Sequence, residues 1–472
     1  MSLRFLLDDE LITLEAVEPA MTVLEWLRLR ARRTGTKEGC AEGDCGACTV
    51  LLGELAGGRV LWRAVNACIL FLPMLAGRAL LTIESLGGTH PVQAELAARH
   101  GSQCGFCTPG IVMSLYARSI GGLGAGQSVE DALAGNLCRC TGYGPILATA
   151  RALATHPRDD TSTLAALRAL AADPGPKEIR HGASRVFLPA SADELAALCL
   201  AHPRARLVAG ATDIGLWVTK HLRVLEDEVI FLGGLGDLRF IEETPEALRL
   251  GAMVRYAEAL PAFTRLHPAL GRLVRRIGGA QIRNAGTIGG NIANGSPIGD
   301  MPPALIALGA TLTLRWGEAR RTLALEDFFI AYGEQDRAPG EFIEAVTIPR
   351  PGPEDVISIS KLSKRFDSDI SSVCGAFNLR VEAGRIIRAR IAFGGMAATP
   401  RRARALEAAL TGAPFTEDTL TAAAPRLRED FAPLTDLRGS AVYRMEVAGN
   451  LLARLWAQSQ NETADVRELA DG

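Results

Sequence analysis

Eight of the ten cysteines in this 472-residue chain lie before residue 141, in two groups of four. In the first group, Cys40, Cys45 and Cys48 stand at C-x4-C-x2-C spacing in a stretch with three glycines, and Cys68 follows. This spacing is typical of a plant-type 2Fe-2S cluster. Glycines suit such a loop, because backbone around an iron–sulfur core needs positive φ angles and close approach to sulfur. Four thiolates also suit tetrahedral zinc, which is the alternative.

The second group forms one C-x2-C pair and one C-x-C pair, at Cys104, Cys107, Cys138 and Cys140. Pro91, Pro109 and Pro145 stand where first helical turns tolerate proline, so each pair is expected in a loop between short helices. A bundle of four such helices can bring the four sulfurs to one end. C-x-C spacing strains a tetrahedral site and favours a second 2Fe-2S cluster, with zinc again the alternative. Cys199 and Cys374 are isolated, and we expect them to be buried small hydrophobes.

The first 85 residues read as strands around one helix. Residues 2–17 predict a hairpin about an Asp-Asp-Glu turn. Thr22 and Glu25 form a capping box, and the helix that follows is expected to stop at Gly35. Further strands are predicted at Thr49–Leu52, Arg59–Val65 and Leu80–Glu84. Farther along the chain, Ser128 and Asp131 resemble a capping box and predict the start of another helix.

Beyond residue 156 the composition changes to that of a linker, with one short helix expected at Leu164–Ala171. The second half mixes strands with helices. It holds two glycine-rich segments, Arg206–Gly215 and Ala285–Ile292, whose backbone could cradle phosphate, although glycine turns are more often structural. The chain has no complete G-x-G-x-x-G and no G-x4-G-K-[ST]. Strands are expected within Ile357–Ile391, and helices at Arg401–Leu410 and Val442–Trp456.

Charge and hydropathy exclude several classes of protein. A net charge of −2 gives no basic footprint for nucleic acid or an anionic membrane. The longest apolar run, Ala67–Gly77, is shorter than the roughly 20 residues of a membrane span. Acidic residues occupy the place of an export signal's apolar core. We therefore expect a cytoplasmic protein with reduced thiols and no nucleic-acid or membrane partner.

The motifs C-x4-C-x2-C, Q-C-G-F-C-T-P-G and L-C-R-C-T-G-Y resemble the iron–sulfur module of the molybdenum hydroxylases over residues 1 to about 155. The resemblance implies an α+β multidomain fold. Its parts would be a ferredoxin-like β-grasp 2Fe-2S domain (1–85), a four-helix 2Fe-2S domain (86–156), a linker (157–180), an α/β FAD-binding domain (181–352) and a C-terminal α/β subdomain (353–465). Gln103 would lie against the molybdopterin of a partner.

The same resemblance implies an FAD site in the second half of the chain. Its residues would be Leu207, Val208, Ala209, Gly210, Ala211, Thr212, Asp213, Ile214, Thr287, Ile288, Gly289, Gly290, Asn291, Asp300 and Lys361. Ile277 departs from the pattern, because relatives can place an aromatic against the adenine there.

The resemblance further implies an electron-transfer subunit with no catalytic residue of its own. Electrons from hypoxanthine or xanthine, oxidised on a separate large molybdopterin subunit, would pass the second thiol group, the first, FAD and then NAD. A heterotetramer of two small and two large subunits is expected. Three alternatives stay open: another molybdenum hydroxylase, a free-standing NADH-dependent iron–sulfur flavoprotein, and a zinc-binding module. The motifs do not specify the substrate. They are also shared by proteins that use NAD and proteins that use oxygen as the final electron acceptor.

Overall fold

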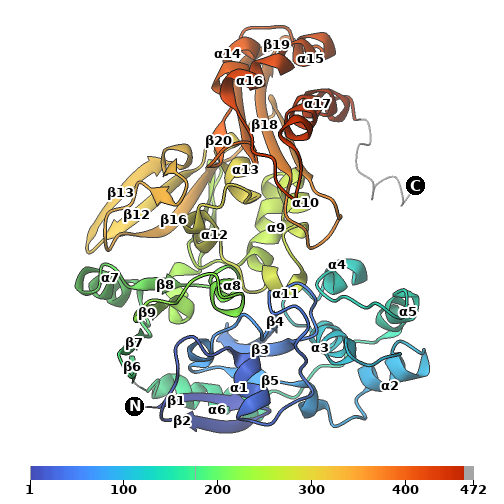
Figure 1. Cartoon of the computed structure of the whole chain (residues 1–472), viewed down its shortest axis with the longest axis vertical. Helices are drawn as coiled ribbons and strands as arrows, with labels where there is room; N and C mark the ends of the chain where they lie inside the picture. The colour runs from blue at the N-terminus through green and yellow to red at the C-terminus, as the bar shows by residue number, and fades with distance from the viewer. Residues whose placement is uncertain (1, 176, 462–472) are drawn as a thin grey trace. The chain divides into compact units, whose positions relative to one another are not determined.

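The computed structural model describes residues 2–175 and 177–461. Three parts of the predicted domains lie outside this range. They are Met1 of the first domain, Pro176 of the linker and residues 462–465 of the C-terminal subdomain. The chain divides into two compact units. The first comprises residues 1–237, 255–258 and 278–290, and the second comprises 238–254, 259–277 and 291–472. Figure 1 shows the elements of each.

The first unit opens with a five-stranded sheet in the order β2-β1-β5-β3-β4. Its strands are β1 (Leu3–Leu7), β2 (Glu10–Leu14), β3 (Thr49–Ala56), β4 (Arg59–Asn66) and β5 (Ala79–Leu81). The predicted hairpin turns at Asp8 and Asp9, which both have positive φ. Strands β1 and β5 are parallel, whereas β3 is antiparallel to both β4 and β5. Helix α1 (Val23–Leu29) buries Leu24 and Leu27 in the same core, which gives a ferredoxin-like domain.

Helix α1 starts as predicted but ends early. The Oγ1 of Thr22 accepts a hydrogen bond from Glu25 N–H, as its cap. The helix stops at Leu29 rather than at Gly35, because Arg32 takes a positive φ and the Arg28 guanidinium donates to carbonyl oxygens farther along the chain. Gly35 has a packing role instead, since a Cβ there would lie 2.4 Å from the Ile83 side chain.

Four short helices follow and share a core with the outer face of the sheet. They are α2 (Pro91–Ala98), α3 (Thr108–Ser119), α4 (Val129–Leu133) and α5 (Gly144–Ala152), and proline lies in the first turn of α2, α3 and α5. Ser128 caps α4 through Asp131 N–H. Helix α6 (Thr161–Ala172) lies in the predicted linker and buries Leu167 and Leu170 in this core. The short helix expected at Leu164–Ala171 is therefore present, as a longer helix that packs on this core.

The first unit also holds a small sheet in the order β6-β7-β9-β8. Strands β7, β8 and β9 are parallel, so helices connect them. The elements are β6 (Glu178–His181), β7 (Ser184–Phe187), α7 (Ala192–Ala201), β8 (Arg206–Val208), α8 (Ile214–Thr219) and β9 (Glu228–Phe231). The strand, turn and helix start predicted at Arg206–Gly215 are present. Short helix α11 (Ala280–Arg283) belongs to this unit as well.

The second unit contains an antiparallel sheet in the order β10-β11-β16-β12-β13. Its strands are β10 (Ile241–Glu243), β11 (Ala247–Gly251), β12 (Thr311–Trp316), β13 (Ala319–Ala324) and β16 (Phe342–Pro349), and β14 (Phe329–Ala331) pairs with β15 (Glu334–Gln335). Helices α10 (Pro268–Arg275) and α13 (Met301–Ala307) belong to this unit. Helices α9 (Tyr256–Leu266) and α12 (Ile288–Asn294) each begin with residues of the first unit and end with residues of the second.

A further sheet of the second unit, in the order β17-β18-β19-β20, carries helices on one face. Its elements are β17 (Asp355–Leu362), β18 (Val373–Glu382), β19 (Arg385–Gly394), β20 (Arg401–Arg402), α14 (Arg404–Leu410), α15 (Glu417–Ala423), α16 (Leu427–Asp430) and α17 (Ala441–Ser459). The strands and helices expected there are present. Cys199 and Cys374 are buried, as expected. The α+β multidomain fold class is confirmed.

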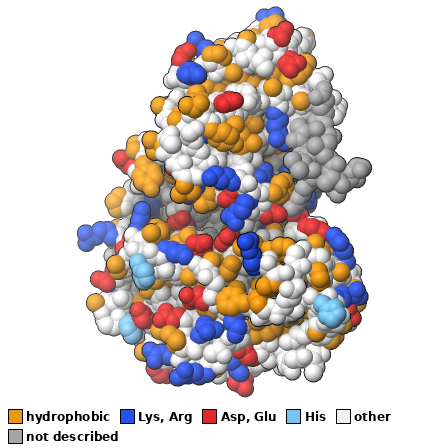
Figure 2. Space-filling view, turned by 45° about the vertical axis from the view of Figure 1, so that its right-hand side comes forward, with side chains coloured by type: hydrophobic (Ala, Val, Ile, Leu, Met, Phe, Trp, Pro, Cys, Tyr) orange, Lys and Arg blue, Asp and Glu red, His pale blue; other side chains and the backbone are white. Residues whose placement is uncertain are grey.

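Within residues 2–175 and 177–461, no helix is both long enough and apolar enough to span a membrane. On the face shown in Figure 2, basic and acidic side chains are interspersed rather than gathered by sign.

Candidate functional site

The first thiol group comes together at the end of the ferredoxin-like sheet. The Cys40 side chain lies beside those of Cys45 and Cys68, and the Cys68 side chain also lies beside that of Cys48. Cys48 and Cys68 are buried, whereas Cys40 and Cys45 are partly exposed. The loop reaches this arrangement with positive φ at Ala41, Gly43 and Gly46. The structure thus brings together all four cysteines predicted from spacing.

Backbone donors surround the Cys40 sulfur. Its Sγ accepts N–H groups from Glu42, Asp44 and Cys45 at 3.4, 3.4 and 3.3 Å. The neighbouring Cys45 thiol, with backbone N–H groups, holds the pKa of Cys40 well below its usual range. The Cys40 thiol in turn raises the pKa of Cys45. Donors aimed at sulfur stabilise thiolate, the form that ligates iron. The loop therefore fits a 2Fe-2S cluster.

Glycine is required in this loop by close packing. A Cβ on Gly39 would lie 2.8 Å from Cys45 Sγ, and one on Gly46 would lie 2.1 Å from Gly135 O. Asn66, which the sequence analysis did not single out, places its Nδ2 3.8 Å from Cys48 Sγ. Its only sequence signal is its position two residues before Cys68.

The second thiol group lies at the ends of the short helices. Cys104 lies beside Cys140, and Cys107 lies beside Cys138. Burial, with the neighbouring Cys138, raises the pKa of Cys107 to about 12. Cys138 N–H donates to the Tyr143 hydroxyl at 3.0 Å, so the T-G-Y part of the motif supports the ligand loop. Cys104 and Cys140 are exposed, in contrast to the first group.

Within each of the two groups, the cysteine side chains lie beside one another. Among the described residues, no group of three or more His, Cys, Asp or Glu side chains has the arrangement of ligands around a single metal ion. The fit to a two-iron cluster rests on four cysteines in each group and on the loops that carry them.

One hydrogen bond joins the two thiol groups through the backbone. The N–H of Leu137, the residue before Cys138, donates to Cys45 O at 2.9 Å. Nearby, the buried Gln281 Nε2 donates to Thr49 Oγ1, Ser114 Oγ and Asn136 Oδ1 at 3.0, 3.2 and 3.0 Å. Sequence reasoning missed Leu137 and Gln281, because neither belongs to a ligand pattern.

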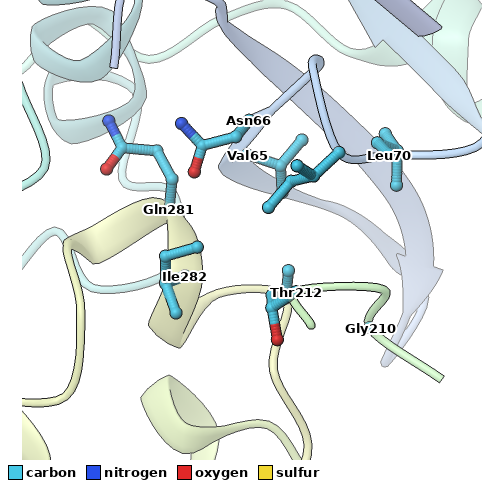
Figure 3. A pocket seen from close by; sticks show the side chains of 9 residues that line it. Val65, Asn66, Leu70, Gly210, Thr212, Gln281 and Ile282 are labelled. Atoms are coloured by element: carbon cyan, nitrogen blue, oxygen red, sulfur yellow. The ribbon is translucent and has the colours of Figure 1, made fainter. Parts of the chain in front are cut away.

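The two glycine-rich segments lie side by side in the first unit. A Cβ on Gly210 would lie 2.0 Å from Ala285 O and 3.1 Å from Gly286 Cα. Ala211 adopts a positive φ in the turn before α8. Gly210, Thr212 and Ile282 line a small cavity of about 10 Å³, together with Asn66 and Gln281. Figure 3 shows these residues around it. The structure therefore brings the predicted segments Leu207–Ile214 and Thr287–Gly290 together.

The second segment is the start of a helix rather than an open turn. Ile288, Gly289 and Gly290 form the first turn of α12, and Gly290 N–H donates to Thr287 Oγ1 at 3.1 Å. Gly289 is buried and Gly290 is exposed. Asn291 Oδ1 is buried with no hydrogen-bond partner among the described residues. Such an orphaned polar atom at the end of the segment fits a site that a ligand completes.

The two other predicted FAD contacts pair with each other in the second unit. Lys361 Nζ lies 2.7 Å from Asp300 Oδ2 and also donates to Arg276 O at 3.0 Å. Ser371 donates to the other Asp300 oxygen at 2.5 Å. Both members of the pair are buried. Contact with FAD stays a prediction for them, as does the effect of Ile277 on adenine binding.

Four protein-family models match successive parts of the chain. They are the 2Fe-2S iron–sulfur cluster binding domain (residues 5–71), the [2Fe-2S] binding domain (82–151), the FAD binding domain in molybdopterin dehydrogenase (180–351) and the CO dehydrogenase flavoprotein C-terminal domain (358–459). The fold and thiol groups define an iron–sulfur flavoprotein with two 2Fe-2S cluster domains and an FAD-binding domain.

Full-length relatives and solved structures narrow this class. Xanthine dehydrogenase of Drosophila subobscura is 34% identical over 464 residues, 84% of this chain, and that of Emericella nidulans is 30% identical over 525 residues, 96% of this chain. The chain spans 34% and 38% of these proteins, about a third of their length.

Two solved structures are also similar. Quinoline 2-oxidoreductase from Pseudomonas putida 86 is 26% identical with a TM-score of 0.53, over 58% of this chain and 95% of that chain. Carbon monoxide dehydrogenase from Hydrogenophaga pseudoflava is 29% identical with a TM-score of 0.54, over 57% and 94%. The chain belongs to the molybdenum hydroxylase family and is an iron–sulfur/FAD electron-transfer module of an oxidoreductase.

Proposed function

We propose that this chain is the electron-transfer part of a xanthine dehydrogenase. It would accept electrons from a molybdopterin-bearing subunit that oxidises hypoxanthine or xanthine and deliver them to NAD, in a cytoplasmic heterotetramer. The eight cysteines of the two groups would hold the clusters, and the segments Leu207–Ile214 and Thr287–Asn291, with Asp300 and Lys361, would hold FAD. When bound, 2Fe-2S clusters carry single electrons, and FAD converts them to the two-electron transfer that NAD requires.

The observation that carries the proposal is the connection between the two thiol groups. Leu137 N–H, next to Cys138, donates to the carbonyl oxygen of Cys45. One hydrogen bond therefore connects a ligand of each group through short stretches of backbone. The first group in turn neighbours the flavin segment, because Ile69, next to Cys68, packs on Gly215 of α8. This order of contacts supports transfer from the second group, through the first, to the flavin.

Exposure supports the placement of the partner. Cys104, Cys140, Gln103 and Arg139 are exposed, and the large side chains of Phe106, Leu137 and Tyr143 are exposed beside them. An apolar patch around a redox site is typical of a surface that a partner covers. It supports docking of the molybdopterin subunit here, with Gln103 at the contact.

The names of the relatives support the proposed purine substrate. The similar full-length proteins are xanthine dehydrogenases, which favours a purine substrate and NAD. The similar solved structures include quinoline 2-oxidoreductase and carbon monoxide dehydrogenase, which supports a second candidate, the same role in a hydroxylase of another substrate. Copurification with the native partner, followed by xanthine-dependent NAD reduction, distinguishes the two. Reduction by another N-heterocycle but not by xanthine would favour the second.

Purified protein should contain four irons and one FAD per chain, because each thiol group holds a two-iron cluster. Iron, zinc and flavin analysis measures this directly. Stoichiometric zinc without iron–sulfur absorption would contradict the proposal.

Cys45→Ser should remove one of two electron paramagnetic resonance signals of the reduced protein and leave the other, because the two groups lie in separate domains. Cys199→Ser, at a buried thiol outside both groups, is the matched control and should keep both signals. Loss of both signals in a folded Cys45→Ser protein would show that the ligands are wrongly grouped.

A further inference from the structure

The C-terminal end of α8 is hydrogen-bonded to the first cluster loop. Thr219 Oγ1 donates to Ala41 O at 2.7 Å, and Lys220 Nζ donates to Cys40 O at 2.5 Å. Lys220 Nζ also lies 3.3 Å from a Glu42 carboxylate oxygen. Two consecutive residues outside the ligand motif thus hold two consecutive carbonyls of the ligand loop.

The N-terminal end of the same helix contacts the other side of the thiol group. A Cβ on Gly215 would lie 2.6 Å from Ile69 Cβ and 2.8 Å from Ile69 O, next to Cys68. The helix begins at Ile214, the last residue of the first predicted FAD segment. A helix of six residues therefore connects the flavin segment to both ends of the first thiol group.

The charges at this contact act on the redox state of the site. Reduction of a 2Fe-2S cluster adds one electron and hence one negative charge, so a neighbouring cation favours the reduced form and a neighbouring anion disfavours it. The Lys220 ammonium contacts the backbone of a ligand residue, while the Glu42 carboxylate lies beside it. Both side chains are about one third to two fifths exposed, at 36% and 42%, so solvent and salt screen their effect without abolishing it.

We propose that Lys220 is a positioning residue for electron transfer, whose ammonium holds the cluster loop at Cys40 and, balanced by Glu42, sets the reduction potential of the cluster on Cys40, Cys45, Cys48 and Cys68. This inference rests on the proposed function, because it requires that cluster to be bound. It assigns a role to a side chain outside the cysteine motifs and the predicted FAD contacts.

The test is a dithionite titration of the full-length protein with both clusters and FAD bound, followed by electron paramagnetic resonance. Lys220→Met should lower the midpoint potential of the signal that Cys45→Ser removes and leave the other signal unchanged. Glu42→Gln should shift the same signal upward, and the double variant should return it toward wild type. Lys220→Arg should keep the wild-type potential, and each shift should shrink as salt concentration rises.

Two control variants separate charge from packing. Lys177 forms another exposed ion pair, with Glu194. Lys177→Met makes the same change of charge there and should leave the reduction potentials of both clusters unchanged. Thr219→Val removes the neighbouring hydrogen bond but no charge, and should shift the potential much less than Lys220→Met.

Opposite shifts for the Lys220 and Glu42 variants would support the proposal, since a general loosening of the loop would not reverse sign. An unchanged potential in Lys220→Met, or equal shifts of both clusters, would overturn it while leaving the proposed function intact. Absence of both cluster signals in wild-type protein would overturn the proposed function, and this inference with it.

Discussion

At the scale of single residues, one buried carboxylate of the first unit lies among guanidinium groups. Glu54 on β3 pairs with both terminal nitrogens of Arg255 at 2.5 and 2.8 Å, and Arg78 lies 3.7 Å away. The side chains of Glu54 and Arg255 are 8% and 4% exposed. The contact joins the ferredoxin-like sheet to residues 255–258 of the same unit. Removing one partner of such a group leaves uncompensated buried charge.

Glu54→Gln should destabilise the first unit by about 3 kcal/mol. It removes the buried carboxylate that pairs with both terminal nitrogens of Arg255 and leaves that guanidinium with Glu258 at 3.2 Å. Thermal unfolding followed by circular dichroism measures the change as a lower midpoint. Glu95→Gln, which breaks the exposed Glu95–Arg99 pair on α2, is the control and should change the midpoint little. Equal midpoints for Glu54→Gln and wild type would show that the buried pair contributes no net stability.

The same carboxylate predicts a pH dependence. Burial opposes ionisation of Glu54, but Arg255, with Arg63 and Arg78, outweighs it and holds the pKa of Glu54 well below the ordinary value of 4.5. Because the folded-state pKa is depressed, the stabilisation is present above pH about 4.5 and is lost as pH falls below it. The difference in unfolding midpoint between wild type and Glu54→Gln should therefore narrow from pH 7 toward pH 3. A constant difference would contradict this assignment.

At the scale of elements, close backbone packing joins β8 and its turn to the segment after α11. A side chain on Gly210 would press on Ala285 O, at 2.0 Å from its Cβ. Overpacking of this kind costs about 1–3 kcal/mol. A larger side chain at Gly210 should therefore separate the two segments predicted to hold FAD and leave the cysteine ligands in place.

Gly210→Val should therefore weaken FAD binding by about tenfold or more, while both clusters stay bound. Flavin and iron content of the purified variant measure the two effects, and retained iron shows that the domains are folded. Gly236→Ala, where an added Cβ meets nothing within 4 Å, should keep full FAD. Full FAD content in Gly210→Val would place the flavin elsewhere.

At the scale of the whole molecule, the exposed second thiol group predicts where the proposed molybdopterin subunit would dock. Substituting Arg139 or Gln103 by alanine should slow electron transfer from that subunit, roughly tenfold for each 1.4 kcal/mol of lost interaction. NADH oxidation with an artificial acceptor should change little, because both residues lie outside the flavin segments. Stopped-flow reduction by the partner with its substrate measures the first rate. Loss of NADH oxidation with unchanged electron transfer from the partner would contradict the proposed order of carriers.

The sequence by itself determined the features that depend on local pattern. Thiol spacing predicted the two groups of four, because C-x4-C-x2-C, C-x2-C and C-x-C each place several cysteines in one short loop. Capping residues and prolines located the starts of α1, α3, α4 and α5. Glycine clusters marked the two segments that lie together at Gly210 and Ala285.

Tertiary structure decided what depends on partners distant in sequence. The early end of α1 follows from Arg28 reaching carbonyls beyond the helix. The hydrogen bond between Leu137 and Cys45 joins residues that no spacing rule connects. The contacts of Lys220 and Glu54 likewise form only when segments far apart in sequence meet. The effect of a charge depends on the burial and the neighbours that the fold gives it.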